Sequence, residues 1–68
     1  MHWTKPYYGV THCGYFSLRS YWCTVTDRNS FVELSKFYPG CGFHPHESTH
    51  ETVEEAKNEA EKWLKANN

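Results

Sequence analysis

The stretch that decides the fold is Glu51-Thr-Val-Glu-Glu-Ala-Lys-Asn-Glu-Ala-Glu-Lys-Trp-Leu-Lys65. Its apolar residues recur at steps of three and four positions: Val53, Ala56, Ala60, Trp63 and Leu64. This spacing predicts an α-helix with a single apolar stripe. Because an isolated helix of this kind is only marginally stable in water, the rest of the chain must supply an apolar surface for the stripe.

Capping residues locate the start of this helix. Thr52 is followed three residues later by Glu55, the pattern of a capping box in which each side chain satisfies a backbone N–H at the helix start. Ser48 and Glu51 form a second such pair, so the start can also lie one turn earlier. We therefore predict a capped C-terminal helix over residues 48–66.

The size and composition of the chain indicate one small domain. A chain of 68 residues buries about 60% of its unfolded surface and has an expected stability of only ~3–5 kcal/mol. Aromatic residues make up 18% of the sequence, and all but Trp63 precede residue 44. Because each large aromatic side chain buries roughly 150–250 Å², a few of them can stand in for a larger aliphatic core.

Charge and cysteine content limit the function classes. The net charge of −1 divides into an excess of cations before residue 47 and an excess of acids after it, and neither part resembles a duplex-DNA binder. The odd number of cysteines, three, argues against a disulfide framework. With no apolar run near the N-terminus to act as a leader or a membrane span, we expect a cytoplasmic protein.

The central part of the chain favours β-structure. Residues 14–27 are rich in aromatic and β-branched residues, which favour strands. Asp27-Arg-Asn-Ser30 is a turn signal, and Phe31–Tyr38 reads as the return strand, so residues 21–38 are predicted to form an antiparallel hairpin. Phe43-His-Pro-His46 is a candidate short edge strand, since Pro45 lacks a ladder donor.

These elements predict an α+β fold of order β-β-β(-β)-α. A three- or four-stranded antiparallel sheet over residues 14–47 carries the C-terminal helix on one face. Residues 1–13 are interpreted as an N-terminal arm or an edge strand. We find no internal repeat and no domain boundary.

Strand alternation predicts a partner-binding surface. The predicted helix-facing residues, which would meet Trp63, are Phe16, Leu18, Cys23, Val25, Val32 and Leu34. Alternation then turns other aromatic side chains to the opposite face: Tyr15, Trp22, Phe31 and Phe37. An exposed aromatic patch commonly marks a binding site for another protein or for a second copy. The alternative is that the N-terminal arm, with its own aromatic residues Trp3, Tyr7 and Tyr8, folds back and covers this face.

Nucleic acid and metal are the other ligands considered. Single-stranded bases could stack on the same aromatic face, with Arg19, Arg28 and Lys36 taking the phosphates. A zinc-stabilised domain is a further alternative, and its candidate ligands are grouped in one loop region: Cys41, His44, His46 and His50. No pair of cysteines has the two- to four-residue spacing of a zinc module, so no cofactor is predicted.

Catalysis is not predicted. The chain has no G-x-S-x-G, H-E-x-x-H or glycine-rich phosphate motif, and a domain of this size has little room for a substrate pocket. The acidic residues Glu54, Glu55, Glu59 and Glu61 are interpreted as a solvated helix face, or as a face that imitates phosphates for a nucleic-acid-binding protein.

The chain resembles small accessory proteins of phages and mobile elements over residues 14–65. The residues that carry the resemblance are Gly14-Tyr-Phe, Trp22-Cys-Thr-Val and the tail Thr52-Val-Glu-Glu-Ala-Lys-Asn-Glu-Ala-Glu-Lys-Trp-Leu64. The resemblance implies a strand-rich domain closed by a helix that binds a host macromolecule, as inhibitors of host polymerases and defence nucleases do. It carries over no functional residue.

Overall fold

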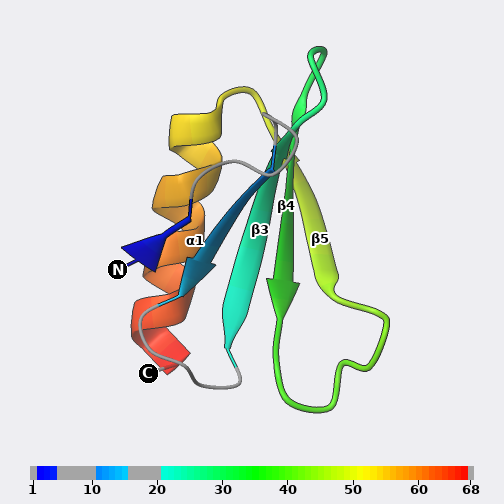
Figure 1. Cartoon of the computed structure of the whole chain (residues 1–68), viewed down its shortest axis with the longest axis vertical. Coiled ribbons are helices and arrows are strands. Elements are labelled where there is room, and N and C mark those ends of the chain that lie inside the picture. The colour runs from blue at the N-terminus through cyan, green and yellow to red at the C-terminus, as the bar shows by residue number, and fades with distance from the viewer. Residues whose placement is uncertain (1, 5–10, 16–20, 68) are drawn as a thin grey trace.

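The protein is an α+β domain in which a five-stranded antiparallel sheet is followed by one C-terminal helix that packs on it (Figure 1). The computed structural model describes residues 2–4, 11–15 and 21–67. The elements are β1 (His2–Trp3), β2 (Thr11–Tyr15), β3 (Trp22–Asp27), β4 (Val32–Phe37), β5 (His46–His50) and α1 (Val53–Asn67). No helix among the described residues is long and apolar enough to cross a membrane.

The sheet is a meander, with each strand antiparallel to the next one in the chain, in the order β1-β2-β3-β4-β5. The predicted fold class is confirmed, but the sheet extends beyond residues 14–47. Strand β2 begins at Thr11, and β1 adds a two-residue edge at His2–Trp3. Residues 1–13 were interpreted as an N-terminal arm or an edge strand. Their described residues in β1 and β2 belong to the sheet.

The hairpin of β3 and β4 forms as its turn residues predict. The Asp27 carboxylate accepts a hydrogen bond from the Asn29 backbone N–H at 2.9 Å, and Asn29 adopts φ = 71°. Asparagine tolerates this left-handed conformation better than most residues. A backbone hydrogen bond from Arg28 N–H to the Phe31 carbonyl, at 2.9 Å, closes the turn.

The edge strand after the hairpin lies later than predicted. Residues 43–45 are not a strand, because two glycines with positive φ, Gly40 at 89° and Gly42 at 60°, fold the segment after β4 into successive turns. The Cys41 N–H donates to the Tyr38 carbonyl, and the His44 N–H donates to the Cys41 carbonyl. Pairing resumes only at His46, opposite Lys36.

The helix begins at the later of its two predicted starts. The Thr52 hydroxyl accepts a hydrogen bond from the Glu55 N–H at 3.1 Å, so Thr52 is the N-cap. The earlier start, with Ser48 as the cap, is wrong because Ser48 pairs with Leu34 as a residue of β5. The predicted range 48–66 thus becomes Val53–Asn67.

The core lies between the helix and the face of the sheet that we call the helix face. This face carries Cys23, Val25, Val32 and Leu34 as predicted. Phe16 and Leu18, which were predicted to share it, lie outside the described residues. The helix contributes Ala56, Ala60 and Leu64, which are fully buried. Two alanines at the contact let the helix axis lie close to the strands. Val53 and Trp63, the other members of the predicted stripe, are partly buried and pack at the margin of the core.

Trp3 of β1 closes one side of this core. Its ring lies over Gly14, whose missing side chain makes room for it: a Cβ there would lie 2.5 Å from the ring. The indole N–H donates to the Glu61 carboxylate at 3.2 Å, and the Lys57 ammonium lies 5.0 Å from the ring centroid. The predicted N-terminal covering of the opposite face is therefore wrong for Trp3, while Tyr7 and Tyr8 lie outside the described residues.

Candidate functional site

The face of the sheet turned away from the helix, which we call the far face, is organised in rows across the strands. Alternation and the observed register place the residues of each row side by side on adjacent strands. The first row holds His2, Tyr15, Trp22 and Phe37. The second holds Cys13, Thr24, Ser35 and Glu47, and the third holds Thr11, Thr26, Glu33 and Thr49.

We call the first row the ring row. It consists of two pairs of side-chain rings and lies at the end of the sheet where β4 leads into the loop of residues 38–45. Trp22 and Phe37 stack with a centroid separation of 4.0 Å and an interplanar angle of 6°. His2 and Tyr15 lie 5.4 Å apart. Because Gly14 pairs with Cys23, the same register brings Tyr15 next to Trp22. Three of the four predicted partner-binding residues are thus neighbours in one row.

Phe31, the fourth predicted residue, does not belong to this site. It lies beside the hairpin turn, at the opposite end of β4 from Phe37. The prediction placed it with the others because strand alternation fixes the face but not the position along the strand. Phe31 is 39% exposed, close to the 37% of Trp22.

Two further aromatic side chains are exposed in the segment that follows β4, and strand alternation did not predict their exposure. Tyr38 directly follows β4 and is 40% exposed, and Phe43 in the next loop is 99% exposed. The two glycine turns around Cys41 hold Phe43 away from the body of the domain. A phenylalanine flanked by glycine in a short loop was the sequence signal for this position.

The rest of the far face is polar. The Thr11 and Thr26 hydroxyls form a cross-strand hydrogen bond at 3.1 Å. Thr26 and Ser35, although on this face, are buried. Glu33 pairs with Arg28 at 3.7 Å in a partly exposed ion pair. Among the described strand residues of this face, the aromatic side chains therefore lie in the ring row at one end.

The described cations predicted to take phosphates lie away from the ring row. Arg28 is in the hairpin turn at the other end of the sheet and pairs with Glu33. Lys36 lies on the helix face, with its ammonium 5.9 Å from the Trp63 ring. Arg19 lies outside the described residues. The described part of the ring row thus has no cation beside it that could neutralise a phosphate.

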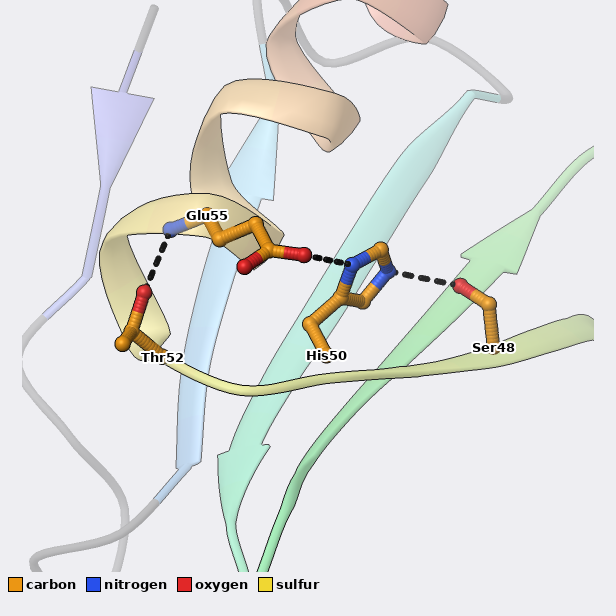
Figure 2. Close-up of polar contacts among 4 residues, drawn as sticks. All are labelled: Ser48, His50, Thr52 and Glu55. Carbon is orange, nitrogen blue, oxygen red and sulfur yellow. Dashed lines mark hydrogen bonds and ion pairs between the residues drawn. The ribbon is translucent and has the colours of Figure 1, made fainter.

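A chain of polar contacts joins the last strand to the helix (Figure 2). The Ser48 hydroxyl lies 3.0 Å from His50 Nε2, and His50 Nδ1 lies 3.4 Å from the Glu55 carboxylate. Ser48 and His50 share a face because they are two residues apart in a strand, and the first turn of α1 brings Glu55 over them. This Ser48-x-His50 alternation before a capped helix was the sequence signal, and sequence analysis missed it.

A hydroxyl, an imidazole and a carboxylate in this order are the groups of a nucleophilic triad, but the surroundings favour a structural role. Ser48 pairs with the fully buried Leu34 on the helix face. The shallow hollow beside His50 is lined by Ser30, Phe31, Thr49, His50, Glu51 and Glu55, and not by Ser48. The serine oxygen therefore does not open into it. The contacts fix the turn between β5 and α1.

The residues proposed as zinc ligands are not brought together. His46 and His50 are four residues apart on β5, which separates them by about 13 Å along the strand. Cys41 and His44 belong to the loop before it. Among the residues that the structure describes, no three histidine, cysteine or acidic side chains are grouped so that they could hold a metal ion.

The two strand cysteines are poor nucleophiles. Burial of Cys23 in the core, with a smaller contribution from the nearby Cys13 thiol, raises its pKa to about 12. Burial also raises the pKa of Cys13. Because the thiolate is the reactive form, neither thiol suits covalent catalysis.

The acidic helix residues divide into two groups. Glu55 and Glu61 are engaged with His50 and Trp3 respectively. Glu54 and Glu59 are exposed and line a shallow hollow along the outer side of the helix. Half of the predicted acidic face thus serves to tie the helix to the strands.

Comparison of the chain with models of protein families, with curated proteins and with solved structures finds no match.

Proposed function

We propose that this protein is a non-enzymatic binding module that docks an apolar surface of another protein on the ring-row end of its far face. The observation that carries the proposal is the Trp22–Phe37 stack, in which Trp22 is 37% exposed although its ring packs flat on its neighbour. Tryptophan and tyrosine contribute disproportionately to the centres of protein interfaces. A contiguous group of exposed apolar side chains commonly marks an interaction site, whereas single scattered ones do not.

The chemistry of the surroundings favours an apolar protein partner over a polyanion. Arg28 and Lys36 lie elsewhere on the molecule, and the neighbouring row offers hydroxyls and a single carboxylate. The ring row itself carries no lysine, arginine or acidic side chain, so a partner segment of apolar side chains that covers only this row would bury none of these charges. The resemblance of residues 14–65 to phage and mobile-element accessory proteins favours a host protein as that partner.

The experiment compares two similarly exposed aromatic residues at opposite ends of the sheet. Wild type, Trp22→Ala and Phe31→Ala are immobilised, and host proteins retained from a lysate are identified and purified. Each is then titrated by calorimetry, with folding of the variants checked by thermal melting. A specific partner should bind Trp22→Ala about 30-fold more weakly, as expected for an interface hot spot, and should bind Phe31→Ala as it binds wild type.

Two outcomes would overturn the proposal. Equal affinity of all three proteins for every purified partner would remove the ring row from the interface. Salt-sensitive binding of short single-stranded oligonucleotides that is lost in Trp22→Ala would assign the rings to base stacking instead.

A further inference from the structure

Strand β5 is an uncovered edge of the sheet. It pairs with β4 on one side, and no other element of the described chain lies beyond it (Figure 1). An edge strand presents a row of N–H and C=O groups that can pair with another strand. The opposite edge, β1, is only two residues long, so β5 is the longer template of the two.

The devices that usually protect such an edge are missing from β5. All five residues of His46–His50 pair with consecutive residues of β4, so no bulge interrupts the strand. The strand contains no proline and no lysine, and its one acidic residue is Glu47. Helix α1 packs against the face of the sheet and leaves its outer edge uncovered (Figure 1).

The sequence of β5 is nearly symmetric about Ser48, with a histidine at each end. An antiparallel pair of two such strands, related by a two-fold axis, places residues of the same face opposite each other. With the axis at Ser48, His46 meets the partner's His50 and Glu47 meets the partner's Thr49. No two acidic residues are opposed.

Two neighbouring registers also keep the helix faces of both copies on the same side of the joined sheet, but they are less favourable. An axis at Glu47 places this carboxylate directly opposite the partner's Glu47. An axis at Thr49 places Glu47 opposite the partner's Glu51. Like charges that face each other across strands are destabilising, so charge selects the pairing centred on Ser48.

We propose that two copies of this chain pair through β5, antiparallel and centred on Ser48, to form one continuous sheet with both helices on the same side. The strand is short, so the contact belongs to the small, weak class of interfaces. The ring row lies on the far face, and the pairing leaves it available. This pairing does not depend on the proposed function, since it uses the edge and not the rings.

The test is a charge swap across the predicted pair of Glu47 and the partner's Thr49. Sedimentation equilibrium is measured across about two decades of concentration into the millimolar range. Thr49→Glu creates two Glu–Glu pairs and should raise the dimer Kd about tenfold. Glu47→Lys combined with Thr49→Glu replaces them with two Lys–Glu pairs and should restore the wild-type Kd or lower it.

The pattern across the variants separates the registers. With the axis at Glu47, the double variant would oppose two lysines and stay dissociated. Thr49→Lys alone separates the remaining two registers: with the axis at Ser48 the new lysine faces the partner's Glu47 and lowers the Kd, whereas with the axis at Thr49 it faces the partner's own residue 49, a second lysine, and raises the Kd. A wild-type protein that is monomeric throughout, or a double variant that fails to recover, overturns the proposal. Because Glu33 neighbours Thr49 within the chain, thermal melting at low concentration checks that Thr49→Glu still folds.

Discussion

The two faces of this sheet carry alternate residues of the same strands and differ in almost every other respect. On the helix face, Val25 and Leu34 pair and are fully buried under the helix. On the far face, one position away, Thr24 and Ser35 pair, and both side chains are polar. A single-residue shift in register would exchange the two faces, so the apolar stripe of the helix and the alternation of the strands must agree.

The difference separates the residues that hold this small domain together from those that carry the proposed binding. Buried aliphatic side chains on one face supply the stability. The exposed rings on the other face are concentrated at one end, where their loss should alter binding more than folding. Substitutions at adjacent positions of one strand therefore separate the two properties.

The largest effect is expected at the centre of the helix face. Leu34→Ala removes a fully buried side chain and should cost about 2–5 kcal/mol, enough to unfold most of the protein given an expected stability of ~3–5 kcal/mol. Its neighbour Glu33 forms only a partly exposed ion pair, so Glu33→Ala should cost less than about 1 kcal/mol. Urea denaturation measures both, and similar losses would contradict the assignment of faces.

A smaller loss is expected where β1 closes the core. Gly14→Ala places a Cβ 2.5 Å from the Trp3 ring and should destabilise the domain by about 1–3 kcal/mol. The same substitution in a Trp3→Ala background should cost much less, because the clash is gone. Cys13→Ala, next in the chain on the far face, is the matched control. Equal costs in both backgrounds would show that Trp3 does not cover Gly14.

The polar tie between β5 and α1 should contribute less again. His50→Ala removes its contacts with Ser48 and Glu55 and should lower the free energy of unfolding by about 1 kcal/mol. The adjacent residue Thr49, which is exposed on the far face, provides the comparison. Thr49→Ala should change the free energy of unfolding by less than about 0.5 kcal/mol. Thermal unfolding of both variants tests the difference, and an unaffected His50→Ala would remove the structural role given to the tie.

The smallest effect is a pH dependence from the helix face. Burial, and then the Lys57 charge, lower the pKa of His12 below its ordinary 6.5. Because the unfolded chain takes up this proton first, stability should fall as pH drops through 6.5 and level off below the folded-state pKa. His12→Gln should reduce the slope of the melting temperature against pH in this window, whereas Thr11→Ala on the far face should leave it unchanged.

Sequence alone predicted the features that depend on local pattern. The helix stripe, the Thr52 cap, the Asp27–Asn29 turn and the alternation of the central hairpin follow from neighbouring residues and are confirmed. The local residue pattern did not predict the number of strands in the sheet. The pairing of β1 and β5 depends on contacts with other strands and not only on their own few residues. The pattern likewise grouped Phe31 with Trp22 but could not place the two residues along the sheet, where they lie at opposite ends.

The meander order has a consequence for biosynthesis. All strands leave the ribosome before the helix, and each can pair with its predecessor as soon as it emerges. The apolar side of the sheet nevertheless stays in contact with water until Ala56, Ala60 and Leu64 have also left the ribosome. Val25 and Leu34 are therefore covered last, by a helix that is made after every strand of the sheet.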